Sequence, residues 1–104
     1  SGVIEARHAR WLWAAMLNRD PTLFYESGKA AWRFDSRPWV SQIDVPTMMI
    51  IPTKDQVIAP RTQYELAGLI SANPVVEISG AGHESVLSHP EDYVVAIESF
   101  LANA

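Results

Sequence analysis

The sequence contains no cysteine, which excludes a disulfide framework and any zinc site built on thiolates. Basic residues are few: 8 Lys and Arg stand against 12 Asp and Glu, and the net charge of -4 argues against a nucleic-acid partner. No apolar run approaches the roughly 18 residues that span a bilayer, and no basic segment leads into an apolar one as in a signal peptide. We therefore expect a cytoplasmic protein without a membrane span.

Motifs for cofactors are also missing. The three histidines have no acidic residue at metal-ligand spacing, so the sequence predicts no metal site. No glycine-rich phosphate loop follows either of the strands predicted below, so no nucleotide site is expected. The sequence predicts no cofactor.

What the sequence does have is enough apolar material for one small domain. Its 104 residues are 48% hydrophobic and 19% charged, a composition that is not typical of disorder. Residues 1–32 read as two helices, Val3 to Arg19 and Pro21 to about Ala31, with Asp20 as the N-cap of the second. The first helix is apolar nearly all round from Trp11 to Leu17, so it needs more covering surface than this chain supplies.

Residues 33–104 predict an α/β fold. Thr47–Ile51 is a short apolar run of the kind that forms a strand buried on both faces. Pro60 opens a helix, Val75–Ser79 forms a second strand, and a capping box of Ser88 and Glu91 opens the last helix. The order is strand, helix, strand, helix. Two parallel strands are too few for a stable sheet, so we expect part of a larger one.

Two titratable residues follow the predicted strands at the same offset. Asp55 lies four residues after Ile51, and His83 lies four residues after Ser79. Functional groups of open α/β sheets lie just past the carboxyl ends of the strands, so we expect both side chains at one end of the sheet. A carboxylate beside an imidazole fixes the tautomer of the ring and stabilises the imidazolium. That pairing would make His83 a general base.

These residues carry a resemblance to a known family. Ile43-Asp44-Val45-Pro46-Thr47, then Asp55, then Gly80-Ala81-Gly82-His83, resemble the C-terminal part of an α/β-hydrolase-fold enzyme. In that family the triad runs nucleophile, acid, histidine along the chain. The resemblance implies that Asp55 is the acid and His83 the histidine, that residues 33–104 are the C-terminal portion of the core, and that residues 1–32 are cap-like.

The sequence departs from that family at the nucleophile, because it holds no Gly-x-Ser-x-Gly motif. We therefore expect a fragment that supplies the acid and the histidine for hydrolysis of an ester-like carbonyl substrate and is inactive alone. Two alternatives stay open: a non-catalytic interaction module, and a dehalogenase, peroxidase or lyase of the same fold. Asp44 is a rival acid, but it precedes the strand and is more typical of a turn. Glu84 is expected to face solvent.

The expected partners follow from the same reasoning. The parent enzyme would take a small-molecule, ester-like substrate. The Thr47–Ile51 strand carries no Lys or other charge that would block its free edge. We expect that edge to pair either with a missing N-terminal segment or with a second copy of the chain in a two-fold dimer.

Overall fold

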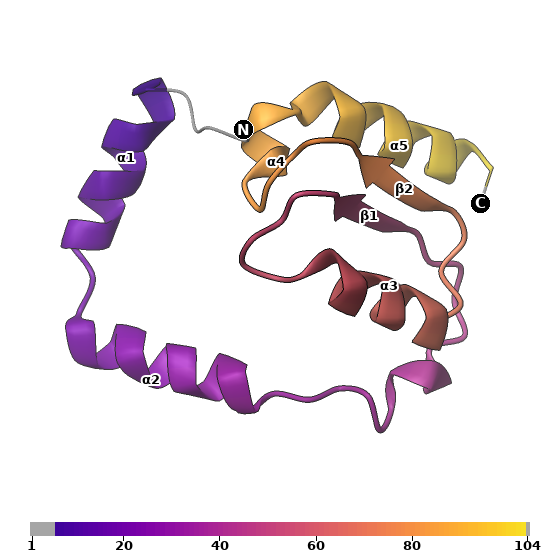
Figure 1. Ribbon diagram of the computed structural model, residues 1–104, viewed down its shortest axis with the longest axis horizontal. Coiled ribbons are helices and arrows are strands. Elements are labelled where there is room, and N and C mark those ends of the chain that lie inside the picture. Colours follow the sequence, from indigo (N-terminus) through magenta and orange to yellow (C-terminus); the bar gives the residue numbers. More distant parts are fainter. Residues whose placement is uncertain (1–5, 104) are drawn as a thin grey trace. The chain divides into compact units, whose positions relative to one another are not determined.

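The computed structural model describes residues 6–103 of the chain, and the chain divides into two compact units. One unit lies within Ile4–Ser36 and holds helices α1 (Ala6–Leu17) and α2 (Pro21–Arg33). The other contains everything from Arg37 onward, including both strands (Figure 1). In the described part of the chain, no helix has the length and apolar character needed to cross a membrane.

The start of α2 confirms the sequence prediction. The Asp20 side chain accepts hydrogen bonds from the backbone N–H groups of Thr22 (2.8 Å) and Leu23 (3.3 Å), and Pro21 takes the first helical position. These bonds satisfy amides that a helix start leaves without partners. The helix runs to Arg33, two residues beyond the predicted end. In the preceding helix, Ala6–Leu17 lies within the predicted span, whereas Val3 falls outside the described residues.

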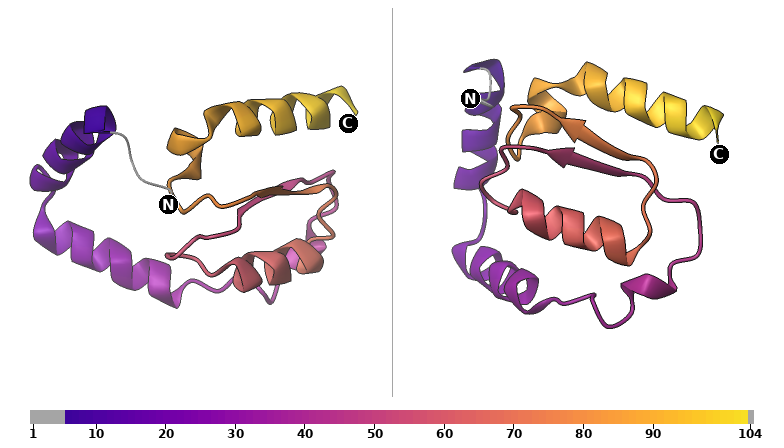
Figure 2. Two further views of the ribbon diagram at one scale, coloured as in Figure 1. Left: turned by 45° about the horizontal axis from the view of Figure 1, so that its top comes forward. Right: turned by 45° about the vertical axis from the view of Figure 1, so that its right-hand side comes forward.

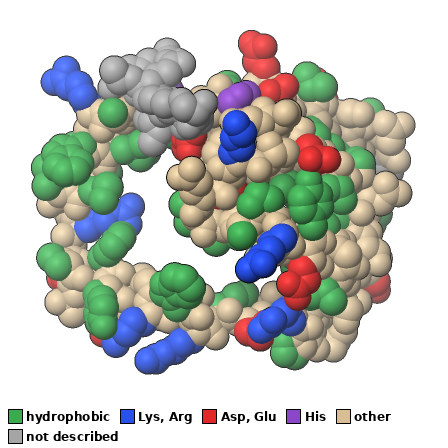
Figure 3. Space-filling model, in the orientation of Figure 1, with side chains coloured by type: hydrophobic (Ala, Val, Ile, Leu, Met, Phe, Trp, Pro, Cys, Tyr) green, Lys and Arg blue, Asp and Glu red, His purple; other side chains and the backbone are tan. Residues whose placement is uncertain are grey.

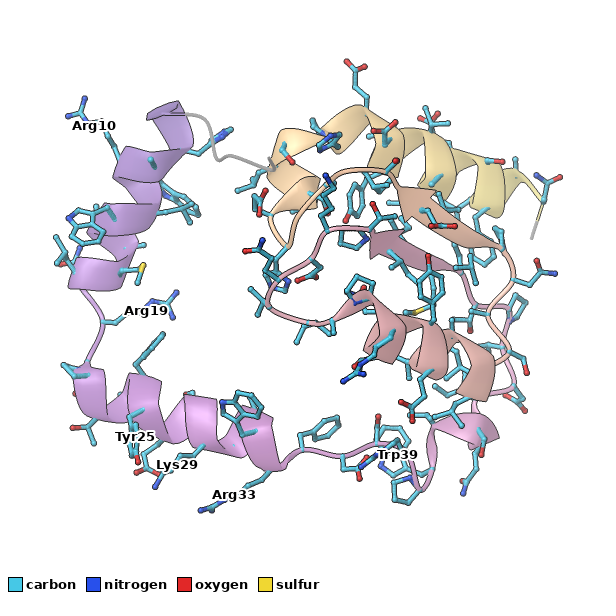
Figure 4. The ribbon with its side chains drawn as sticks, viewed as in Figure 1. Arg10, Arg19, Tyr25, Lys29, Arg33 and Trp39 are labelled. Atoms are coloured by element: carbon cyan, nitrogen blue, oxygen red, sulfur yellow. The ribbon has the colours of Figure 1, made fainter. Side chains whose placement is uncertain are left out.

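The surfaces of α1 and α2 carry large apolar side chains. Trp11 is 65% exposed and Trp32 is 91% exposed, and hydrophobic side chains are visible on both helices in Figure 3. The polar contacts within α2 are local: Tyr25 and Lys29 project from one side of the helix (Figure 4), with the Lys29 Nζ atom 4.9 Å from the ring centroid. The unit itself therefore offers little cover for its aromatic side chains.

The second unit is built on a parallel pair of strands, β1 (Met49–Pro52) and β2 (Val75–Ile78). Met49 lies opposite Val75, and Pro52 lies opposite Ile78. Helices α3 (Pro60–Leu69) and α5 (Pro90–Ala102) cover opposite faces of the pair (Figures 1 and 2). The 3-10 helix η1 (Val40–Gln42) precedes β1, and the short α4 (Ser85–Ser88) precedes α5. The predicted order of strand, helix, strand and helix is confirmed.

The strand boundaries differ from those predicted. β1 begins at Met49 because the ladder opens there, with the Met49 N–H donating to the Pro74 carbonyl at 3.2 Å. Thr47 lies before this ladder: its carbonyl accepts the N–H of Asn73, a residue of the loop that leads into β2. β2 ends at Ile78 because the chain turns at Gly80, whose φ of 75° is costly for any residue with a Cβ.

The predicted capping box is wrong. Ser88 is the last residue of α4, and its N–H already donates to the Glu84 carbonyl. The N-cap of α5 is His89, and the Ser88 hydroxyl contacts the His89 Nδ1 atom at 2.7 Å. Ser88 therefore lies one residue too early to cap α5, since the helix begins directly at Pro90.

The core of this unit is small and centres on the carboxyl ends of the strands. Ile51 and Ala81 are fully buried, and Ile78 is 3% exposed. Met49 and Ile50 are only half-buried, so the prediction of a strand buried on both faces holds only for the end of β1. The best-packed part of the unit thus lies where the two strands release their loops.

Candidate active site

The loops that follow β1 and β2 are held together by backbone hydrogen bonds. The Thr53 N–H donates to the Ile78 carbonyl (3.1 Å), and the Lys54 N–H donates to the Ala81 carbonyl (2.9 Å). The Thr53 hydroxyl accepts the Gly80 N–H at 2.8 Å. The parallel ladder therefore continues past the strands, and it fixes the path of both loops before they reach Asp55 and His83.

The carboxylate of Asp55 is buried and accepts four hydrogen bonds. Its side chain is 3% exposed. The Oδ1 atom accepts the backbone N–H groups of Val57 (2.8 Å) and Ile58 (2.9 Å). The Oδ2 atom accepts the side-chain amide of Gln63 (3.1 Å) and faces the His83 Nδ1 atom at 3.0 Å. Each oxygen of this buried carboxylate thus accepts two hydrogen bonds, as expected for a buried polar group.

The structure brings Asp55 and His83 together at the carboxyl ends of the two strands. The sequence predicted that each residue lies at the same distance along the chain from the end of its strand, and this prediction is wrong. Asp55 lies three residues after the end of β1 at Pro52, and His83 lies five residues after the end of β2 at Ile78. The longer second loop carries His83 across to the carboxylate. The imidazole is 54% exposed, and its Nε2 atom lies on the opposite side of the ring from Asp55.

The environment of Asp55 favours the ionised form. Burial is the largest single influence and acts to raise the pKa of this carboxyl group, but the hydrogen bonds from His83 and from the Ile58 and Val57 N–H groups, with the charge of His83, together outweigh it. The pKa of Asp55 therefore lies below its usual value. An ionised carboxylate is acceptor-only, so the facing Nδ1 atom of His83 must carry a proton.

A hollow of about 440 Å³ adjoins the imidazole. It is lined by Lys54, Gln56, Val57, Gly82, His83 and Glu84. The prediction that Glu84 faces solvent is wrong: the side chain folds back toward Gly82, and its Oε1 atom is buried. A Cβ added to Gly82 would stand 2.9 Å from the Glu84 Oε2 atom, so the glycine makes room for this carboxylate.

Neither the rival acid Asp44 nor the neighbouring histidine His89 joins the Asp55–His83 pair. Asp44 is exposed and lies before β1, at the amino-terminal side of the strand. His89 contacts Ser88 instead. Within residues 6–103, no group of three or more His, Cys, Asp or Glu side chains could hold a metal ion.

Sequence reasoning missed one side chain that contacts the pair and one hydrogen bond that follows His83 in the chain. Gln63 donates to Asp55 from α3, and the hydroxyls of Ser85 and Tyr93 share a short hydrogen bond that links α4 to α5. Ser85 is 1% exposed and lies two residues after His83. The one available signal was the position of Gln63 in the first helical turn after the Asp55 loop, where a long amide can reach back.

A family model for the alpha/beta hydrolase fold matches residues 15–90, which include both Asp55 and His83. The match covers more than half of the chain, and the chain therefore belongs to the α/β-hydrolase-fold family.

Particular relatives agree with this assignment. The chain is 30% identical over 81 residues to a pimeloyl-[acyl-carrier protein] methyl ester esterase of Neisseria meningitidis serogroup A, across 78% of this chain and 26% of that esterase. It is 31% identical over 64 residues to a 2-hydroxy-6-oxo-6-(2'-aminophenyl)hexa-2,4-dienoic acid hydrolase of Metapseudomonas resinovorans, across 62% of this chain and 22% of that hydrolase.

A solved structure matches as well. The crystal structure of a serine hydrolase involved in carbazole degradation, the CarC enzyme, superposes with a TM-score of 0.63 at 30% identity. The superposition covers 68% of this chain and 28% of that enzyme. The chain thus spans about a quarter of the length of these relatives.

Proposed function

We propose that Asp55 and His83 are the acid and the histidine of a hydrolase triad, and that the chain contributes them to the hydrolysis of an ester-like carbonyl substrate. The observation that carries the proposal is the 3.0 Å contact between the Asp55 Oδ2 and His83 Nδ1 atoms at the carboxyl ends of two parallel strands. A buried carboxylate that holds a half-exposed imidazole through Nδ1 is the arrangement a general base requires.

In this mechanism the half-exposed ring performs the proton transfers. With Nδ1 protonated and bound to Asp55, Nε2 has a free lone pair and removes the proton of a nucleophile. The resulting imidazolium is stabilised by the Asp55 carboxylate. His83 then returns the proton from Nε2 to the leaving group, and Asp55 stays ionised throughout.

The nucleophile is proposed to come from outside these 104 residues, since the sequence holds no Gly-x-Ser-x-Gly motif. The chain alone would then have a general base with nothing to activate. Two further parts of the proposal concern the whole enzyme: residues 33–104 form the C-terminal portion of its core, and residues 1–32 belong to a helical cap over the substrate. The exposed aromatic side chains of α1 and α2 support the second part.

An ester-like substrate is supported by one relative, which is named as a methyl ester esterase. The other two are named as a dienoic acid hydrolase and a serine hydrolase, which supports hydrolysis without specifying an ester. Ester and thioester hydrolysis use the same acid and histidine.

A chimera tests this proposal directly. The part of the meningococcal esterase that matches this chain would be replaced by the chain itself, so that both Asp55 and His83 are included, and the hydrolysis of a short-chain nitrophenyl ester would be measured. We expect the chimera to be active. Asp55→Asn should lower this activity by about 10⁴-fold, because the asparagine amide stabilises the wrong tautomer of His83, and His83→Ala should lower it at least as far. The matched controls Asp44→Asn and His89→Ala should leave activity within about twofold, since neither side chain contacts the pair.

Two outcomes would contradict the proposal. Activity that survives His83→Ala would remove the general base from the mechanism. A chimera that folds, as judged by circular dichroism, but is inactive would instead favour the interaction module, which the exposed Trp11 and Trp32 side chains also support.

We also propose that the isolated chain associates through the free edge of β1. Because Met49 and Thr53 donate toward β2, alternation along the strand turns the backbone N–H and C=O groups of Ile50 away from β2. Paired antiparallel across a two-fold axis, two copies would form a four-stranded sheet. Light scattering at micromolar concentration should give a dimer for the wild type and a monomer for Ile50→Pro, which lacks the outward N–H. A monomeric wild type would contradict this part.

A further inference from the structure

Gln63 is a half-buried amide on α3 that lies against two acceptors at once. Its Nε2 atom stands 3.1 Å from the Asp55 Oδ2 atom and 2.8 Å from the Ile58 carbonyl oxygen. An amide nitrogen carries two protons, so one group can serve both contacts. Through this side chain, α3 is hydrogen-bonded to the loop that carries Asp55.

The chemistry of the two partners fixes the orientation of this amide. An ionised carboxylate and a backbone carbonyl can only accept hydrogen bonds. If the amide were turned over, its oxygen would face two further acceptors and both bonds would be lost. The nitrogen of Gln63 therefore faces Asp55 and Ile58, and the donors of the side chain are fully used.

The two oxygens of Asp55 are held in different ways. Oδ1 accepts the N–H groups of Val57 and Ile58, which belong to the same loop as Asp55 itself. Those bonds move with the loop and cannot fix it relative to the rest of the unit. Gln63 is the donor from α3, so its contact ties both the Oδ2 atom and the Ile58 carbonyl to a helix packed on the sheet.

We infer that Gln63 is a positioning residue: its two hydrogen bonds hold the Asp55 loop against α3 and keep the Asp55 Oδ2 atom facing the His83 Nδ1 atom. This inference rests on the proposed function, in which that contact sets the tautomer of His83. Without the two donors of Gln63, the bonds from Val57 and Ile58 still orient the carboxylate within its loop, but the loop is free to shift away from the imidazole and to carry the Oδ2 atom with it. The Nδ1–H tautomer then loses its advantage.

The test measures the tautomer of His83 in the chain itself, which requires no nucleophile and no substrate. ¹⁵N-labelled chain is studied by NMR at a pH where the imidazole is neutral, and the Nδ1 and Nε2 shifts report which nitrogen carries the proton. Gln63→Met keeps the length of the side chain and removes both donors. Gln63→Leu repeats the measurement with a branched side chain, and Gln42→Met on the exposed face of η1 is the matched control.

We expect the wild type and Gln42→Met to hold mainly the Nδ1–H form. Gln63→Met should shift the Nδ1 resonance toward the position of an unprotonated nitrogen, as should Asp55→Asn. If Asp55→Asn moves the tautomer but Gln63→Met and Gln63→Leu leave it unchanged, Gln63 has no positioning role and the Asp55–His83 pair stands. If none of the variants moves it, the pair itself does not hold His83, and the proposed function fails with it.

Discussion

Replacement of Asp55 by alanine should destabilise the strand-bearing unit by an amount set by its lost hydrogen bonds. The N–H groups of Val57 and Ile58 lose a buried acceptor, while Gln63 and His83 can turn to solvent. A typical bond contributes about 0.5–1.5 kcal/mol. The two bonds whose loss leaves a buried N–H group without an acceptor are taken at about 1 kcal/mol each, and the two whose donors can turn to solvent at about 0.5 kcal/mol each, so the loss is roughly 3 kcal/mol. Relief of the buried charge offsets about 1 kcal/mol of this, and the expected net cost is about 2 kcal/mol.

Asp55→Asn isolates the backbone part of this cost. Its carbonyl oxygen still accepts the N–H groups of Val57 and Ile58, while its amide nitrogen meets the donor of Gln63. We expect this variant to lose only about 1 kcal/mol. With a urea slope of about 1 kcal/mol per molar for so small a unit, the two variants should differ by roughly 1 M in midpoint.

The assay is urea unfolding followed by circular dichroism at one fixed protein concentration, because association would shift every midpoint. Equal losses in Asp55→Ala and Asp55→Asn would refute the reasoning, since the two N–H bonds to the Oδ1 atom would then contribute nothing.

Further outcomes follow from burial, charge and the missing motif. Because the pKa of Asp55 is lower in the folded chain than in the unfolded one, its contribution to stability is complete above the unfolded pKa of about 3.9 and is lost as the pH falls toward the folded value. The stability gap between wild type and Asp55→Asn should therefore narrow below about pH 4 in urea titrations, and a gap that widened there would contradict the assigned direction. Ile51→Ala should cost about 2–5 kcal/mol in the same unfolding assay, since Ile51 is fully buried beside the strand end; a loss below about 1 kcal/mol would mean that the site collapses around the cavity. The chain alone should hydrolyse a nitrophenyl ester no faster than free imidazole does, and a rate well above that level would place a nucleophile within these residues.

The order of the elements could be predicted from the sequence because the residues that begin and end them act through local backbone preferences. Pro60 marks the start of α3, and Gly80 marks the turn after β2, so each boundary depends on one residue's own backbone preference. The proximity of Asp55 and His83 was also predictable. Parallel neighbours bring their carboxyl ends to one edge, and both loops are short.

What the sequence could not predict depends on the path of the chain between elements. The place of Gln63 in the first turn of α3 allows its amide to reach the preceding loop, but the contact with Asp55 also depends on the path of that loop, which no local preference specifies. Glu84 was expected in solvent, yet Gly82 leaves the space that its carboxylate occupies. The misassigned cap at Ser88 has a similar origin, since α4 takes up a residue whose type is typical of a helix start.

The hydrogen bonds that join the two loops have a consequence for how the pair could be moved between proteins. Every bond that orients the carboxylate, and every bond that ties its loop to that of the histidine, arises between Thr53 and His83. The carboxylate and the imidazole therefore lie within one continuous stretch, which holds the loop after β1, helix α3, strand β2 and the turn that follows it. Recombination that exchanged this stretch as a block would carry the pair over together with the hydrogen bonds that orient it, whereas a crossover within it would separate the two side chains.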